Sequence, residues 1–296
     1  MTTDDLNTQF AYGDEIRVAA GPGGMAMVMV NNRHAQAHIH LDGAHLTHFQ
    51  PKGQKPVLWV SPTSFFQPGK PIRGGIPICW PWFGPHPTGK GQMAHGFARV
   101  RAWRLVSTAR HSDGQSRIEL ALDSDAASLA LWPFSFALRL VVTVGATLEV
   151  ALTTTNPGPE PMLYDDALHT YLAVGDVRRA AISGLEGAVY LDKIAGARAV
   201  QLGPITCTGL TDRVYGSTAT CTIRDPEWDR SLVIEKSGST ETVVWNPWSD
   251  KAGTFADFPA DGWPGMVCVE AANCLEHRLM LPAGTAHTTV TRIRVA

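Results

Sequence analysis

Alternation of apolar and polar residues with a period of two constrains this chain more than any other feature. Eight segments rich in β-branched residues show it: 36–41, 117–122, 136–144, 147–154, 220–225, 231–236, 241–246 and 288–295. Turn sequences such as VGAT, NPGPEP and SGST separate several of them, and only residues 124–132 show a helical pattern. Many short strands without alternating long helices exclude a parallel βαβ sheet. They predict an all-β antiparallel sandwich or barrel with few short helices.

Length and charge limit the function classes. The 296 residues suffice for a sizeable core, and we expect a single domain over 1–296. A net charge of -2 gives no general attraction to nucleic acid. Five cysteines, an odd number without a C-x-x-C pair, are typical of reduced thiols. The N-terminus is polar and acidic, and no apolar run approaches the roughly 20 residues of a membrane helix. We therefore expect a soluble, cytoplasmic protein.

The longest irregular segment, residues 67–91, contains IRGGIPICWPWFG. Its glycines and prolines predict a shaped loop with exposed aromatic surface, and long ordered loops are usually functional. Arg73 and Arg99 frame it. The two glycines after Arg73 would let backbone N–H groups approach an anion beside the guanidinium. The alternative is that both are ordinary surface arginines, like their neighbours Arg101 and Arg104.

Two further residues are candidates for acid–base chemistry. Glu270 ends the apolar run MVCVE, and a buried acid at a strand end is costly unless it is paired or used. The alternative, a paired or solvent-facing Glu just past the strand, is the one the sequence alone favours. For His169, in ALHTYL, the alternative is a neutral core histidine with both ring nitrogens hydrogen-bonded.

Histidines crowd residues 34–48. His38 and His40 would share one face of a strand and could form a metal pair, as in cupin-type sandwiches. No further ligands follow at a recognisable spacing, so we favour a half-solvated strand face. The chain has no nucleotide-binding glycine motif, no G-x-S-x-G and no zinc motif.

Six motifs occur in order between residues 72 and 272: IRGGIPICWPWFGPHP, HGFAR, ALHTYL, TDRVY, VVWNPW and MVCVEAA. Together they resemble the hexose-6-phosphate mutarotases, the glucose-6-phosphate 1-epimerases, a branch of the aldose 1-epimerase superfamily. The resemblance implies a galactose-mutarotase-like β-supersandwich with no metal and no nucleotide cofactor. It implies one small-molecule partner, a sugar phosphate, with no nucleic acid and no membrane, and we expect a monomer.

The resemblance also implies roles for residues. His169 would be the general acid and Glu270 the general base. Arg73 and Arg99 would contact the phosphate, and the sugar pocket would be lined by His95 and Asp212. Ordinary pKa values make the glutamate a carboxylate at neutral pH, and a nearby carboxylate and a phosphate dianion would favour the imidazolium.

The sequence departs from the family pattern at two places. Ala94 stands where some relatives carry Gln, which puts one polar contact in doubt, and Ala271 stands where Pro is more usual. Three alternatives remain open: a mutarotase of unphosphorylated aldoses, a non-catalytic sugar-phosphate sensor of the same fold, and a cupin-like metalloenzyme that uses the N-terminal histidines.

Overall fold

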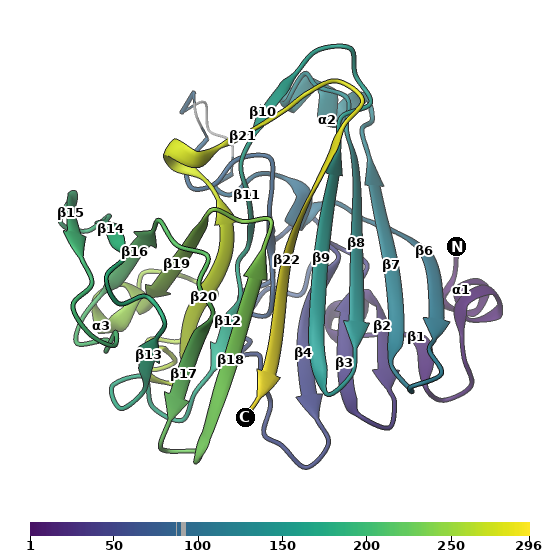
Figure 1. Ribbon diagram of the computed structural model, residues 1–296. Coiled ribbons are helices and arrows are strands. Elements are labelled where there is room, and N and C mark those ends of the chain that lie inside the picture. Colours follow the sequence, from purple (N-terminus) through teal and green to yellow (C-terminus); the bar gives the residue numbers. More distant parts are fainter. Residues whose placement is uncertain (87, 90–92) are drawn as a thin grey trace.

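The computed structural model describes residues 1–86, 88–89 and 93–296 (Figure 1). Residues 87, 90 and 91 of the expected irregular segment lie outside the described residues. Within the described part the chain is mostly β, and every pairing between its named strands is antiparallel. The predicted fold class is confirmed.

Two eight-stranded sheets form the body of the molecule. The first has the order β13-β17-β18-β22-β9-β8-β7-β6: Ala181–Ser183, Cys221–Asp225, Arg230–Ser237, Ala286–Val295, Thr147–Thr155, Ala137–Val144, Ser116–Asp123 and Arg104–Arg110. The second has the order β15-β14-β16-β19-β20-β11-β5: Ala197–Val200, Val189–Asp192, Thr211–Tyr215, Glu241–Asn246, Met266–Asn273, Asp166–Leu168 and Ile78–Cys79. Its eighth strand, β12 (Tyr171–Ala173), also pairs with β20.

Smaller elements complete the fold. A four-stranded sheet, in which β3 contacts β8, has the order β1-β2-β3-β4: Ile16–Ala20, Ala26–Asn31, Ala35–His40 and His45–Pro51. Strands β10 (Met162–Tyr164) and β21 (Leu279–Leu281) form a pair. The helices are short: α1 Thr3–Phe10, α2 Ala126–Leu131, α3 Trp248–Ala252, η1 Pro22–Gly24, η2 Ala98–Val100, η3 Trp263–Gly265 and η4 Leu275–His277. Among the described residues, no helix is both long and apolar enough to cross a membrane.

The burial pattern explains which strands the alternation reveals. In β8 and β9 every second residue is buried, because one face packs on the core and the other is partly solvated. Strands β19 and β20 are buried at every position. One face of β20 carries Val267 and Val269 into the main core, toward β18 and β22. The opposite face carries Cys268 and Glu270, and the candidate site lies there.

Candidate active site

All six residues predicted from the sequence line one cavity of about 430 Å³. Its walls come from the loop before η2, the turn between β11 and β12, strands β16, β19 and β20, and the segment around α3. The structure therefore brings together six side chains from five separate motifs: Arg73, His95, Arg99, His169, Asp212 and Glu270.

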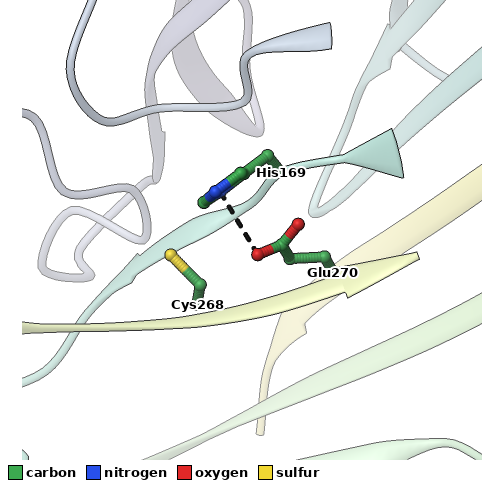
Figure 2. Close-up of side chains that lie close together, drawn as sticks. All are labelled: His169, Cys268 and Glu270. Atoms are coloured by element: carbon green, nitrogen blue, oxygen red, sulfur yellow. Dashed lines mark ion pairs between the residues drawn. The ribbon is translucent and has the colours of Figure 1, made fainter. Parts of the chain in front are cut away.

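His169 and Glu270 face each other at the base of this cavity (Figure 2). His169 lies in the turn between β11 and β12, where its backbone N–H donates to the Pro77 carbonyl at 3.1 Å. Its ring stacks on Tyr171 with centroids 4.8 Å apart and planes inclined by 12°. The Nδ1 atom lies 3.4 Å from Oε1 of Glu270. Adjacent strands thus hold the two groups within proton-transfer range.

The structure corrects the placement of Glu270. The residue lies in the middle of β20, opposite Val243 of β19, and its exposed fraction is 0%. The position past the strand end and the solvent-facing alternative are wrong, while the ionisable group within pairing distance of Glu270 is His169. Neither carboxylate oxygen has a hydrogen-bond partner in the described part of the chain. A buried acid without a hydrogen bond is costly, and such groups gather at functional sites.

Burial sets the charge of this pair. It lowers the pKa of His169 to about 3, and the positive charges of Arg99 and Arg73 act in the same direction. It raises the pKa of Glu270 well above its ordinary value, and the nearby Asp212 adds to the rise. The ligand-free pair therefore favours neutral imidazole and protonated carboxyl, not the expected imidazolium and carboxylate. His169 is neutral, but its Nδ1 has no hydrogen-bond partner among the described residues, so it is not a fully satisfied core histidine.

Arg73 reaches the cavity as one half of an ion pair. Its guanidinium donates to Asp257 at 3.1–3.2 Å and to the Tyr171 hydroxyl at 3.4 Å. It also lies over the ring of Phe255, 4.7 Å from the centroid. Its side chain is 21% exposed, so Arg73 is not an ordinary surface arginine.

The glycines beside Arg73 have a different role from the one expected. Gly75 has φ +65°, and its N–H donates to the Trp59 carbonyl at 2.7 Å, so it is not free for an anion. A Cβ on Gly74 would lie 2.4 Å from the Trp59 carbonyl oxygen, and one on Gly75 would lie 2.2 Å from that of Leu46. Glycine is needed because other backbone segments pass too close for a side chain.

Arg99, like Lys251, is a cation of the site without an ion-pair partner among the described residues. It belongs to η2, and its Nη2 donates to the carbonyl of Ala94 at 2.7 Å. Its Nε is buried without a hydrogen-bond partner, and no carboxylate of the described chain forms an ion pair with it. Ala94 thus contributes its backbone where some relatives carry Gln. By contrast, Arg101 pairs with Asp125 at the surface.

His95 and Asp212 both line the cavity, as does Lys193. His95 has φ 64°, an uncommon value for a residue other than glycine, and its backbone N–H donates to the Gly84 carbonyl at 2.7 Å. Such strain costs of order 1–3 kcal/mol and persists where the surroundings enforce it. Asp212 forms an ion pair with Lys193 at 3.2 Å. Polar groups for binding a hydroxylated ligand are therefore present, but the two roles stay predictions.

The aromatic surface differs from the expectation. Trp80 and Trp82, from the glycine- and proline-rich loop, are 0% and 2% exposed and belong to the main core. Trp248 packs on Trp263, with centroids 4.1 Å apart. Of the four tryptophans in the two Trp/Pro segments, Trp245 lines the cavity. The loop therefore supplies core packing more than an exposed aromatic face.

Sequence reasoning missed several residues of the site. Lys193, Lys251 and Phe255 line the cavity, and Asp257 holds Arg73. None lies in a motif with a chemical signature, so only three-dimensional proximity identifies them. Among the described residues, the one group of three or more metal-ligating side chains is His169, Cys268 and Glu270, not the N-terminal histidines.

Comparison with known proteins agrees with this geometry. The family model for aldose 1-epimerase matches residues 25–294. A protein of Escherichia coli K12 named "Putative glucose-6-phosphate 1-epimerase" is 35% identical over 273 residues, 91% of this chain and 90% of its own. One of the same name from Cenchrus ciliaris is 34% identical, over 85% of this chain and 79% of its own.

Solved structures agree as well. A crystal structure of a "putative mutarotase" from Salmonella typhimurium superposes with a TM-score of 0.90 at 29% identity, covering 99% of this chain and 98% of the other. A galactose mutarotase-like protein from Lactobacillus casei, at 18% identity, covers 91% of this chain and all of its own with a TM-score of 0.71, and so shares the fold. The chain belongs to the aldose 1-epimerase family.

Proposed function

We propose that this protein interconverts the α and β anomers of a hexose 6-phosphate resembling glucose 6-phosphate. The observation that carries the proposal is one cavity that holds a buried acid–base pair, His169 and Glu270, together with the uncompensated cation Arg99. The names of relatives at about 35% identity point to the same substrate.

The reaction needs only proton transfers. One group removes the proton of the anomeric hydroxyl while another protonates the ring oxygen. The C1–O5 bond breaks, leaving an aldehyde at C1 and a hydroxyl at C5. Rotation about C1–C2 and closure on the other face, with the proton movements reversed, give the second anomer. Positioned acids and bases contribute typically about 10²–10⁴-fold to such steps.

His169 and Glu270 supply one acid and one base when they hold a single proton between them. The ligand-free pair carries that proton on Glu270. A bound phosphate dianion offsets the positive charges of Arg99 and Arg73, which depress the basicity of His169. With substrate bound, the proton moves across the 3.4 Å gap to His169, leaving Glu270 as the base and His169 as the acid.

The cations would hold the phosphate away from the reacting bond. Arg99 and Arg73 line the cavity, and Lys193 and Lys251 add positive charge to its wall. Hydrogen bonds to charged groups contribute roughly 1.5–3 kcal/mol each. His95 and Asp212 would contact the sugar hydroxyls.

Anomer exchange followed by NMR, with glucose 6-phosphate and free glucose, tests the proposal. We expect Arg99→Ala to raise KM for the phosphorylated sugar more than it lowers kcat, because a remote contact stabilises ground and transition states alike. Slow exchange of free glucose should stay nearly unchanged. Arg99→Lys should restore part of the loss, since an ammonium lacks the planar guanidinium. Arg101→Ala, which removes a surface arginine two residues away, is the matched control.

A mutarotase of unphosphorylated aldoses is the second candidate. The pairing of Arg73 with Asp257 favours it, because that guanidinium is already compensated. Equal damage to both sugars in Arg99→Ala would favour this candidate. Tight binding of the sugar phosphate without catalysed exchange would instead indicate a non-catalytic sensor.

A further inference from the structure

Three side chains of different chemistry converge beside the cavity (Figure 2). A ring nitrogen of His169, Cys268 Sγ and a carboxylate oxygen of Glu270 all lie within 4.8 Å of one another. Cys268 and Glu270 are two residues apart on β20 and so point to the same face, while His169 approaches from the β11–β12 turn. The proposed acid–base reaction uses His169 and Glu270 and gives no role to the thiol.

The donor atoms are buried and unsatisfied. The exposed fractions of His169, Cys268 and Glu270 are 8%, 0% and 0%. The histidine Nδ1 and both carboxylate oxygens have no hydrogen-bond partner among the described residues. Buried polar atoms without hydrogen-bond partners destabilise the folded protein. A ligand that bonds to these atoms would remove part of this unfavourable free energy. An imidazole nitrogen, a thiolate and a carboxylate are the three ligand types that Zn²⁺ takes in proteins.

The spacing suits a tetrahedral ion. Zn²⁺ bonds of about 2.0–2.3 Å put neighbouring ligand atoms roughly 3.3–3.6 Å apart. The separation of 3.4 Å between His169 Nδ1 and Glu270 Oε1 already meets this, and the sulfur needs to approach by about 1 Å at most. His169 and Glu270 both line the cavity, which leaves a fourth position for water.

We propose that His169, Cys268 and Glu270 form a binding site for a thiophilic divalent ion such as Zn²⁺, and that the ion blocks the acid–base pair. The ion would occupy the lone pairs that proton transfer requires, so it inhibits and is not a cofactor. Arg99 and Arg73 repel it, which limits affinity and makes binding reversible by chelation.

Metal titration of the purified, chelator-treated full chain tests the site without reference to activity. Calorimetry with Zn²⁺ should give one site per chain. Co²⁺ should give the intense near-ultraviolet band of a cobalt–thiolate bond. Cys268→Ala should lose this band and weaken Zn²⁺ binding by more than about tenfold, since even outer-shell changes cost about 10–100-fold. Cys207→Ala, which removes another buried thiol, is the matched control and should keep both.

Anomer exchange measured with rising Zn²⁺ tests the block. Inhibition should compete with the sugar phosphate, reverse with EDTA and weaken in Cys268→Ala. If that variant does not fold, Cys268→Ser serves instead, because its hydroxyl is a poor zinc ligand. Unchanged metal affinity in the folded variant, or no Zn²⁺ binding by the wild type, would overturn the site. Zn²⁺ binding without inhibition would overturn the claim that the ion blocks the acid–base pair. If the protein has no mutarotase activity, the metal titration still tests the site.

Discussion

His169 and Glu270 lose most of their contact with water, and this loss favours the neutral form of each side chain. Two buried groups 3.4 Å apart titrate as a pair, and the singly protonated pair offers one proton donor and one proton acceptor. Because the second proton binds His169 only near pH 3, the singly protonated form persists through the acidic range below the ordinary pKa of histidine. Burial thus keeps the pair ready for catalysis.

Replacing Glu270 by Gln tests the acid–base pair. Glu270→Gln keeps the size and the neutral charge of the protonated acid, so the melting temperature and circular dichroism should stay close to those of the wild type. Catalysed exchange should fall by about 10²–10⁴-fold, because the amide cannot accept and return the proton. Exchange at the wild-type rate in a folded variant would exclude Glu270 as a catalytic residue.

The charge of His169 can be observed directly. Imidazole ¹⁵N shifts, assigned with His169→Asn, should show a neutral ring at pH 5.5 in the ligand-free protein, because burial and two arginines oppose protonation. Adding glucose 6-phosphate should raise the pKa of His169, since the dianion offsets Arg99 and Arg73. A histidine that titrates near 6.5 without ligand would contradict this account.

The family resemblance, carried by the order of the motifs, predicted six residues that the fold places in one cavity. Partners of those residues were not predictable. Arg73 and Asp257 are 184 positions apart, and no local pattern links them. The same holds for Cys268, which the sequence presents as one apolar residue within a strand, and for the charge of His169, which depends on burial in three dimensions.

At the scale of elements, alternation and β-branched residues predicted eight strands, of which β19 is buried at every position and the others have a partly solvated face. All eight predicted segments form strands, and residues 124–132 contain α2. Strand β20 is covered on both faces and has no apolar–polar alternation, so only its apolar run MVCVE was noted in the sequence. Glu270 was therefore expected at a strand end. Helix α1 was missed although Thr2 and Asp5 form a capping box at its start, a signal visible in the sequence.

The segment between α3 and η3 orients Arg73, which is proposed to bind the phosphate. Asp257 of this segment accepts hydrogen bonds from Nε and Nη2 of Arg73, which fixes the plane of the guanidinium. Asp257→Asn should raise KM for the sugar phosphate several-fold with little change in kcat, because Arg73 loses a fixed orientation. Exchange kinetics on phosphorylated and free glucose measure this.

Asp261→Asn, an exposed position in the same segment, is the matched control and should behave as the wild type. A lower KM in Asp257→Asn would contradict the orienting role, since it would mean that Asp257 competes with the phosphate for Arg73.

For the whole molecule, the strand pattern alone predicted antiparallel sheets without deciding between sandwich and barrel, and the family resemblance supplied the β-supersandwich that the structure confirms. That choice depends on pairings between distant strands, such as β9 with β22, and on the contacts of β20 with β18 and β22. The four-stranded sheet buries two histidines of the segment that was expected to be a half-solvated face, while His38 and His48 are half-buried. His40 and His45 are 1% and 0% exposed.

These histidines make the stability of the fold depend on pH. Burial lowers the pKa of His40 and His48 to about 4 and that of His45 to about 3, as it lowers that of His169. In the unfolded chain their pKa returns to about 6.5. Between pH 6.5 and about 4 the unfolded chain therefore binds more protons, and the free energy of unfolding falls as pH decreases. Asp166, whose pKa burial raises to about 6, opposes this, as do Asp42, Asp165 and Glu270, whose pKa values burial also raises. The histidines outnumber these carboxyl groups, because burial also lowers the pKa values of His38 and His95.

Urea unfolding between pH 7 and pH 4.5 should accordingly show a steady loss of stability. Each uncompensated proton contributes at most about 1.4 kcal/mol per pH unit. His48→Gln, outside the active site, should make the dependence shallower because one of these protons is removed. His111→Gln removes an exposed histidine and should leave the slope unchanged. A free energy of unfolding that rises toward pH 4.5 would contradict the neutral, buried state of these histidines, because the folded chain would then bind more protons than the unfolded chain.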